Sequence, residues 1–244
     1  MNILSIGNSF SQDAQRYLWE IAKAEGVNLF TVNLYIGGCS LSRHYRNMHG
    51  DAKEYALEVN GIKTGFLVTM KEALLSRDWD VITVQQVSSQ SPDYESYQPY
   101  LDGIIEYVRR LAPKAKIAIH QTWAYEQGSK RLCEEMGYSH YSEMLGDIVK
   151  AYAAAAEHIG ADLIIPSGEV FGAMLEKGIG KIHRDTFHAS LGLGRYALGL
   201  TWYRFLTGNS VAGNTFGNFD EPVPAEECAI ARACVEAVAA RYGM

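Results

Sequence analysis

The sequence predicts one α/β domain over residues 1–244, in which helices cover both faces of a five-stranded parallel sheet. Two observations support this prediction: five short apolar runs have the character of buried strands, and stretches with helical spacing of apolar residues separate them. Strands that alternate with helices along a chain typically form a parallel sheet. We expect the strand order 2-1-3-4-5, which such open sheets commonly use.

The predicted strands are short, rich in β-branched residues and bounded by polar or turn residues. They comprise residues 3–6, 29–34, 81–84, 116–120 and 162–165. Between and after them, apolar side chains recur at helical spacing, and several of these stretches end at a glycine or shortly before a proline. The predicted helices comprise residues 12–26, 100–111, 141–159, 193–206 and 225–242.

Residues 39–65 interrupt this alternation because they carry no strong helical period. Within them, Asn60 and Gly61 separate the runs 55–59 and 62–64, and an Asn-Gly pair between alternating runs favours a β-hairpin. We therefore expect a hairpin that forms a small excursion from the main sheet. No repeat or low-complexity tract indicates a second domain.

The charge balance argues against nucleic acid as a partner. The chain carries 22 Lys and Arg against 28 Asp and Glu, a net charge of −6, and its basic residues are scattered. No apolar run approaches the roughly 18 residues of a membrane span, and no signal-like stretch precedes the first strand. We expect a cytoplasmic protein, although a secreted protein whose leader had been removed would read the same.

The cysteines do not suggest a disulfide framework or a metal site. Cys39, Cys133, Cys228 and Cys234 form no Cys-x-x-Cys pair, and no His-rich segment lies near them. We expect reduced residues in the core. The sequence has no P-loop, and the glycine-containing run at 192–194 has no strand before it, so it does not predict a dinucleotide site. We therefore expect neither a metal nor another cofactor.

Ligands of open α/β sheets bind beyond the carboxyl ends of the strands, so the residues directly after each strand are the candidates for chemistry. In this chain those positions hold small or polar residues. They are Ser9 after the first strand, Gly37 and Gly38 after the second, Gln85 and Gln86 after the third, and residues 120–123 after the fourth.

Ser9 and the late pair Asp185 and His188 are the parts of a hydrolytic triad. A serine hydroxyl is a weak nucleophile and needs a base, and the ordinary pKa of imidazole lies near neutral pH. Asp185 would orient the imidazole through the other ring nitrogen. The glycine turn after the second strand frees backbone N–H groups, and the Gln86 amide offers a further donor for a developing oxyanion.

Three segments resemble sequence blocks of the SGNH (GDSL-type) esterase and lipase superfamily. They are residues 7–11, Gly-Asn-Ser-Phe-Ser, for the first block, residues 38–40 for the second and residues 185–190 for the fifth. The resemblance implies a three-layer α/β/α, flavodoxin-like fold and hydrolysis of esters through an acyl-serine. On this chain it implies Ser9 as nucleophile, His188 as base and Asp185 as the residue that orients the base.

The resemblance also implies that the backbone N–H groups of Ser9 and Gly38 hold the oxyanion, with a third donor after the third strand. The third block normally ends in Gly-x-Asn, whereas this chain reads Val-Gln-Gln-Val-Ser-Ser. Gln86 is our choice for the missing amide, and Gln85 and Ser89 are the alternatives. The superfamily usually has aspartate at the position of Asn8, which is mainly structural there.

With glutamine in place of the asparagine of the third block, the chain resembles a less-characterised branch of the superfamily whose members act mainly on carbohydrate esters. We therefore expect a metal-independent serine esterase of the carboxylic ester hydrolases that acts on small O-acyl groups, with acetyl groups on sugars as candidates. Gln85, Gln121 and Trp123 are the residues we expect to bind the substrate. Gln121, Trp123 and Tyr125 follow the fourth strand and would form a wall on which a sugar stacks, since aromatic rings offer flat apolar faces with polar edges; ordinary packing beside the sheet is an equal alternative. The expected partner is a small-molecule or carbohydrate ester, and the sequence does not predict the oligomeric state.

Two other functions remain open at this stage. The first is a non-catalytic ligand-binding domain on the same scaffold, in which the altered third block marks loss of the oxyanion hole. The second is a flavodoxin-like nucleotide binder, in which residues 7–11 cradle a phosphate at a helix N-terminus.

Overall fold

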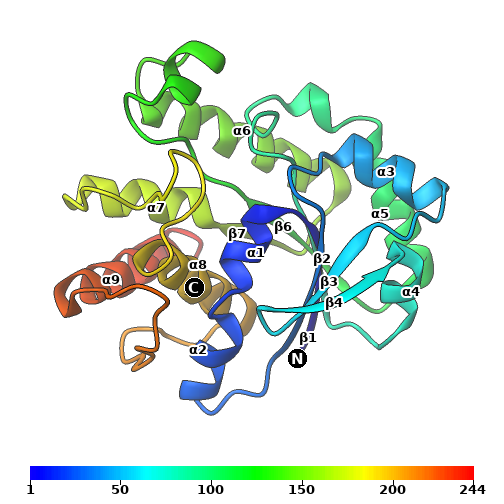
Figure 1. Cartoon of the computed structure of the whole chain (residues 1–244), viewed down its shortest axis with the longest axis horizontal. Coiled ribbons are helices and arrows are strands. Elements are labelled where there is room, and N and C mark those ends of the chain that lie inside the picture. Colours follow the sequence, from blue (N-terminus) through cyan, green and yellow to red (C-terminus); the bar gives the residue numbers. More distant parts are fainter.

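The computed structural model describes residues 1–244 and is built on one seven-stranded sheet, in the order β4-β3-β2-β1-β5-β6-β7 (Figure 1). Five neighbouring strands run parallel: β1 (Asn2–Gly7), β2 (Phe30–Tyr35), β5 (Val81–Val84), β6 (Lys116–Gln121) and β7 (Leu163–Pro166). Their spatial order is the predicted 2-1-3-4-5. Because they share one direction, their carboxyl ends lie at one edge of the sheet.

The prediction of a purely parallel, five-stranded sheet is wrong because the hairpin within residues 39–65 joins the sheet instead of leaving it. β3 (Tyr55–Val59) pairs antiparallel with β2, and β4 (Ile62–Val68) pairs antiparallel with β3. Asn60 and Gly61 have φ values of +49° and +76°, the left-handed backbone that a two-residue hairpin turn requires. The hairpin thereby covers the backbone groups that β2 would expose as an edge strand.

Helices cover both faces of the sheet and bury two apolar clusters of 34 and 32 residues. The first cluster packs beneath α1 (Ser9–Gln15), α2 (Leu18–Ala24), α7 (Ser167–Glu176), α8 (Leu193–Thr207) and α9 (Ala225–Arg241). The second packs beneath α3 (Leu41–His49), α4 (Met70–Leu75), α5 (Tyr100–Leu111) and α6 (Tyr141–Ile159), with the short turns η1 (Tyr94–Tyr97) and η2 (Arg131–Glu135) nearby. No helix is both long enough and apolar enough to cross a bilayer.

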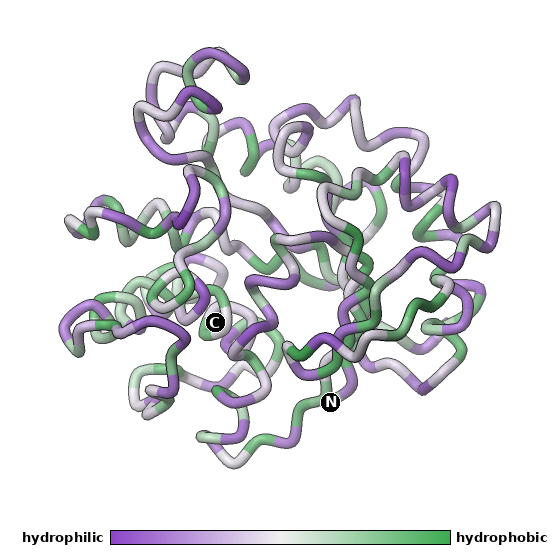
Figure 2. The backbone as a smooth tube through the Cα atoms, viewed as in Figure 1, coloured by the Kyte–Doolittle hydropathy of each residue, from purple (hydrophilic) through white to green (hydrophobic).

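Successive side chains of a strand point to opposite faces of the sheet and therefore belong alternately to the two clusters. Ile3 of β1 lies in the first cluster and Leu4 in the second, and Val81 and Ile82 of β5 divide in the same way. Figure 2 shows hydrophobic stretches along the central strands and more hydrophilic stretches on the outer loops. The sheet therefore forms the wall between two separate cores.

Two helical features differ from the prediction. α3 lies within residues 39–65, where the sequence shows no strong helical period. The helix predicted over residues 12–26 begins earlier, at Ser9, and is divided into α1 and α2. The early start follows from Asn8, whose side chain caps α1 by accepting a hydrogen bond from the backbone N–H of Phe10 at 3.0 Å.

The cysteines are free thiols, but they are not all in the core. Cys39, Cys228 and Cys234 are buried, whereas Cys133 is exposed. The prediction fails for Cys133 because this residue belongs to η2, in the segment between β6 and α6 that projects from the layered core (Figure 1).

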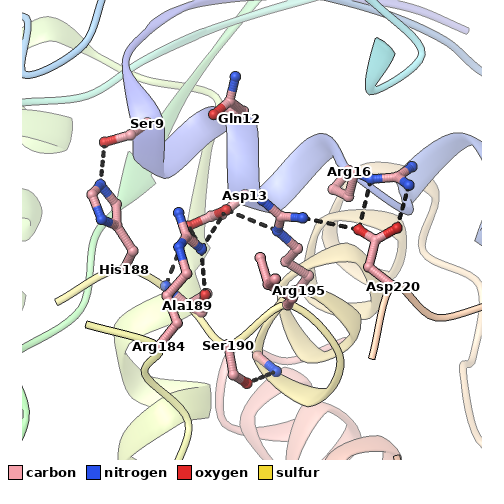
Figure 3. A network of polar contacts seen from close by, with 12 residues as sticks. Ser9, Gln12, Asp13, Arg16, Arg184, His188, Ala189, Ser190, Arg195 and Asp220 are labelled. Atoms are coloured by element: carbon pink, nitrogen blue, oxygen red, sulfur yellow. Dashed lines mark hydrogen bonds and ion pairs between the residues drawn. The ribbon is translucent and has the colours of Figure 1, made fainter. Parts of the chain in front are cut away.

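A buried aspartate fastens α1 to the last quarter of the chain (Figure 3). The Asp13 carboxylate is fully buried and accepts hydrogen bonds from Arg184 Nη1 at 2.9 and 3.0 Å and from Arg195 Nε at 2.9 Å. It also accepts one from the backbone N–H of Ala189 at 3.2 Å, and Arg184 donates to the Ala189 carbonyl. Because a buried charge must be paired and hydrogen-bonded, this cluster holds the segment 184–189 against α1.

Three histidines are buried in the neutral form. Burial lowers the pKa of His44 and of His120 to about 3, and it lowers the pKa of His183 to about 4. His183 Nε2 lies 3.0 Å from the Ala124 carbonyl, so that ring nitrogen donates its proton there. The buried environment of each ring thus opposes protonation at pH values where an exposed histidine would be charged.

We predict that replacing the Asp13 carboxylate lowers stability strongly. Asp13→Asn should reduce the free energy of unfolding by about 3–5 kcal/mol, because it leaves two arginines beside a neutral group at a buried site. Urea unfolding measures this loss. Asp220→Asn is the matched control, since Asp220 pairs with Arg16 and Arg195 at a more exposed position and should contribute about 1 kcal/mol or less. Equal losses in the two variants would contradict the assignment.

We also predict that stability falls as the pH is lowered from 7 to 5. Below pH 6.5 the unfolded chain protonates His44, His120 and His183, whereas the folded chain does not until about pH 3–4. Unfolding then takes up protons, so each buried histidine costs up to about 1.4 kcal/mol per pH unit in this window. Urea midpoints at several pH values test this. His44→Gln should flatten the slope, and His49→Gln, at an exposed position, should not; a flat profile for the parent chain would refute the prediction.

Candidate active site

Ser9 stands at the first turn of α1, directly beyond the carboxyl end of β1. The turn is tight: a Cβ atom at Gly7 would lie only 2.1 Å from Ser11 Oγ, so glycine is required for the helix to begin this close to the strand. The backbone N–H of Asn8 donates to Ser11 Oγ at 3.1 Å, which completes a capping box with the Asn8 side chain. This local geometry presents Ser9 at the edge where the parallel strands end.

His188 and Asp185 meet Ser9 through a continuous series of hydrogen bonds. The Ser9 Oγ atom lies 2.9 Å from His188 Nε2, and His188 Nδ1 lies 2.8 Å from Asp185 Oδ2 (Figure 3 shows the Ser9–His188 pair). Because a carboxylate accepts at Nδ1, that nitrogen carries the proton and Nε2 is left to accept from the serine hydroxyl. The three residues predicted from the sequence are therefore brought together with the polarity that deprotonation of Ser9 needs.

The carboxylate of Asp185 is kept ionised by the residue it orients. Partial burial alone would raise the pKa of Asp185, but hydrogen bonds from the ring and the backbone N–H of His188, together with the positive charge of Arg184, lower it overall. The backbone contact, from His188 N to Asp185 Oδ1, measures 2.9 Å. A charged Asp185 therefore stabilises the positive charge that His188 acquires when it takes a proton.

The loop that carries this pair is pinned from several sides. His183 and Ala189 form a β-bridge at its base, and Trp123 Nε1 donates to the Phe187 carbonyl at 2.7 Å. At its tip, Thr186 has a φ of +75°, and its carbonyl accepts a hydrogen bond from the backbone N–H of Glu126 at 2.7 Å. These contacts hold the imidazole in place although His188 lies 179 residues after Ser9 in the chain.

A cavity of about 400 Å³ opens at Ser9 and His188. Its walls come from the turns after β1, β2 and β5, from the segment after β6 and from the loop before α8. They consist of Asn8, Ser9, Phe10, Tyr35, Gly37, Gly38, Val87, Ser88, Ser89, Tyr125, Arg131, Phe187 and His188. A volume of this size suits a small molecule.

Two of the predicted oxyanion donors lie at this cavity. Ser9 and Gly38 both line it, and the backbone N–H of neither residue has a hydrogen-bond partner within the protein. Gly38 has a φ of +60°, a conformation that favours glycine and turns the chain sharply beyond β2. Both N–H groups are thus available to a ligand bound beside the Ser9 hydroxyl.

The prediction that the Gln86 side chain supplies the third donor is wrong. Gln86 is fully buried and does not line the cavity. Its Oε1 accepts hydrogen bonds from the backbone N–H groups of Leu41 and Val87 at 2.9 Å, and its Nε2 donates to the carbonyl and the hydroxyl of Ser96. Both polar atoms of the Gln86 amide are thus hydrogen-bonded within the protein, where they connect three segments of the chain.

The residues predicted to line the substrate also serve the scaffold. Gln85 donates to Asn8 Oδ1 at 2.8 Å and accepts from His120, and the Gln121 amide is engaged with Glu169. Trp123 is fully buried and stacks on Phe10, with ring centroids 4.0 Å apart. None of the three lines the cavity. The structure therefore favours the alternative of packing beside the sheet, in which buried polar groups satisfy one another.

The walls contain Tyr125, which the sequence offered as a substrate-lining residue, and two candidates that it did not offer, Arg131 and Phe187. Tyr125, Arg131 and Phe187 face the same cavity as Ser9 and His188. Phe187 lies within the Asp-x-x-His segment, and Tyr125 follows the fourth predicted strand, so both positions carried a weak signal. Arg131 carried none, because it lies ten residues past the end of β6, in the irregular turn η2.

The chain matches the family described as a domain of unknown function, DUF4886, over residues 2–238. A search of curated proteins gives no match. Among solved structures, a DUF4886 family protein from Bacteroides uniformis superposes with a TM-score of 0.93 at 33% identity, with 100% of this chain and 96% of that chain covered.

More distant structures share the fold. A protein from Slackia heliotrinireducens, described as a candidate SGNH hydrolase, superposes with a TM-score of 0.60 at 20% identity, covering 84% of this chain and 98% of that chain. A family 3 carbohydrate esterase from Clostridium thermocellum superposes with a TM-score of 0.51 at 10% identity, covering 85% and 96%. These likenesses confirm the predicted relationship to the SGNH hydrolases at the level of the fold. On the match over residues 2–238 and the 33% identical relative, this protein belongs to the DUF4886 family.

Proposed function

We propose that this protein is a serine esterase that hydrolyses small O-acyl esters through an acyl-Ser9 intermediate. The observation that carries the proposal is the hydrogen-bonded series from Ser9 Oγ to His188 Nε2 and from His188 Nδ1 to Asp185, at the wall of a cavity. A serine hydroxyl that is paired with an imidazole, which a carboxylate orients in turn, is the arrangement that acyl transfer requires.

In the first step, His188 Nε2 takes the proton from Ser9 Oγ as this oxygen attacks the carbonyl carbon of the ester. The tetrahedral oxyanion accepts hydrogen bonds from the free backbone N–H groups of Ser9 and Gly38. Collapse breaks the bond to the alcohol, whose oxygen takes the proton from His188. Water, deprotonated by His188, then attacks the acyl-serine and releases the carboxylic acid and the free hydroxyl of Ser9.

The third oxyanion donor, in our proposal, comes from Ser89 instead of Gln86. Ser89 is exposed, and it lines the cavity one turn after β5, where the superfamily pattern expects a donor. A hydroxyl can rotate to donate to a developing oxyanion as an amide would. Ser88 is less suited to this role, because its hydroxyl already pairs with that of Tyr125 at 3.0 Å.

Small acyl groups on polar alcohols are the substrates that this cavity supports best. Its volume of about 400 Å³ is modest, and its walls combine aromatic rings with hydroxyl and backbone groups. Aromatic faces with polar edges suit sugar rings. The fold shared with a carbohydrate esterase supports acetylated carbohydrates as a candidate substrate class.

We predict that a fluorophosphonate probe labels the protein covalently and that Ser9→Ala abolishes labelling. The reason is that only a serine activated by a base attacks phosphorus at a useful rate. Mass spectrometry of the intact protein measures the adduct. Ser11→Ala is not a suitable control because Ser11 belongs to the capping box of α1. Ser42→Ala, in α3, is used instead and should label fully. Absence of labelling in the parent chain would favour the non-catalytic alternative.

We predict that His188→Ala lowers the turnover of a short-chain aryl ester by at least about 10³-fold, because triad residues act as a unit. His158→Ala provides a matched control. His158 also pairs with a carboxylate, that of Asp102 at 3.0 Å, but on the exposed surface and without a serine. Initial rates with 4-nitrophenyl acetate should be unchanged in this control. Near-full activity of His188→Ala would mean that the base is assigned to the wrong residue.

A further inference from the structure

One cationic side chain faces the cavity that contains Ser9 and His188. Among the 13 residues that line this cavity, Arg131 is the only one of the Lys, Arg, Asp and Glu types. The chain as a whole carries a net charge of −6, so its general field repels anions. A positive charge beside the nucleophile is therefore a local exception that requires an explanation.

The position of Arg131 is fixed by stacking. Its guanidinium carbon lies 4.1 Å from the centroid of the Phe187 ring, and the centroids of Phe187 and His188 lie 3.9 Å apart. A guanidinium over an aromatic face is held in orientation while the N–H groups at its rim stay available. The stack therefore places the positive charge on the imidazole side of the cavity.

The guanidinium has one acidic partner, Glu135, in an exposed ion pair one helical turn along the chain. The two groups lie 3.8 Å apart, which is beyond hydrogen-bond distance, and the Arg131 side chain is 41% exposed. An exposed pair of this kind contributes little to stability. Structural pairing with Glu135 thus does not account for an arginine at this position.

The imidazole side of the cavity is the side of the leaving alcohol. In acyl transfer the protonated base returns its proton to the leaving oxygen, so the alcohol part of the ester must lie beside His188. The acyl carbonyl oxygen must instead face the N–H groups of Ser9 and Gly38. A charge stacked on Phe187, whose ring packs against His188, therefore meets the alcohol part of the substrate.

From these observations we propose that Arg131 binds a carboxylate carried by the alcohol part of the ester, so that the substrates are acyl esters of hydroxy acids or acidic sugars. This inference rests on the esterase function proposed above. A single guanidinium matches a single carboxylate charge, and its planar donors fit that group in a bidentate manner. A phosphate monoester would bring up to two negative charges to a cavity with one cation.

The test compares two aryl acetates that differ in charge, 4-acetoxybenzoate and the neutral 4-acetoxybenzamide. For each enzyme, kcat/KM on the anionic ester is divided by kcat/KM on the neutral one, and this quotient for Arg131→Gln is compared with that of the parent chain. Intrinsic reactivity of the two esters cancels in the comparison, as does any shift of His188. We expect the quotient to fall about tenfold, as the loss of one charge-assisted contact predicts, and Arg131→Lys to retain part of it.

Two controls separate recognition by Arg131 from a general charge effect. Arg110→Gln removes another stacked guanidinium, which lies 5.1 Å from the Tyr107 ring centroid on α5, and should leave the quotient unchanged. The second control moves the carboxylate to the acyl side, with 4-nitrophenyl hemisuccinate compared with 4-nitrophenyl acetate. Arg131→Gln should change this second quotient little, and a larger effect there than with the benzoate pair would overturn the assignment to the alcohol side.

The outcomes also distinguish this inference from the proposed function. If the parent chain is labelled by fluorophosphonate and hydrolyses the neutral ester, but Arg131→Gln leaves the benzoate quotient unchanged, the esterase stands and the role of Arg131 is refuted. If the parent chain is neither labelled nor active on any of the four esters, the esterase proposal fails, and the role of Arg131 fails with it.

Discussion

The arrangement of the site depends on the side-chain amide of Asn8. Its Nδ2 donates to the Cys39 carbonyl at 3.0 Å, while its Oδ1 accepts from Phe10 N and from Gln85 Nε2. One residue thus ties together the turns that follow β1, β2 and β5, which contribute Ser9, Gly38 and Ser89 to the cavity. Aspartate is usual at this position in the SGNH superfamily, but a carboxylate has no proton to donate to the Cys39 carbonyl. This site therefore needs a residue that donates as well as accepts.

The hydrogen-bond network that begins at Asn8 continues into the core through the polar residues at the strand ends. Gln85 Oε1 accepts from His120 Nδ1 at 2.6 Å, and His120 Nε2 accepts from the Ser167 hydroxyl at 3.0 Å. The low pKa of His120, about 3 because of burial, keeps this ring neutral and able to donate on one side and accept on the other. A polar group at the end of a buried strand can therefore be part of the support of the site instead of its chemistry.

The parts of the molecule that the sequence predicted are those in which local rules agree with the fold. Short β-branched runs identified the five parallel strands, and their order is the one that open sheets of this kind commonly use. The tight Gly-Asn-Ser turn and the Asp-x-x-His spacing identified Ser9, Asp185 and His188, because each is set by a few neighbouring residues. The rest depends on distant partners. Neither the pairing of β3 with β2 nor the engagement of Gln86 with Ser96 can be read from local patterns, because tertiary contacts determine them.

The stability of the fold and the integrity of the site are therefore coupled through α1. Asp13 lies one turn after Ser9 on this helix, and it binds Arg184 and Ala189, which flank the segment carrying Asp185 and His188. The helix that presents the hydroxyl thus also anchors the loop that presents the imidazole, so the two cannot shift independently. Arg131 contacts this framework only by stacking on Phe187, and its ion pair, with Glu135, is exposed. Because these contacts contribute little to stability, Arg131 can be replaced while the scaffold and the triad geometry stay fixed. Substrate selectivity is expected to arise at such positions.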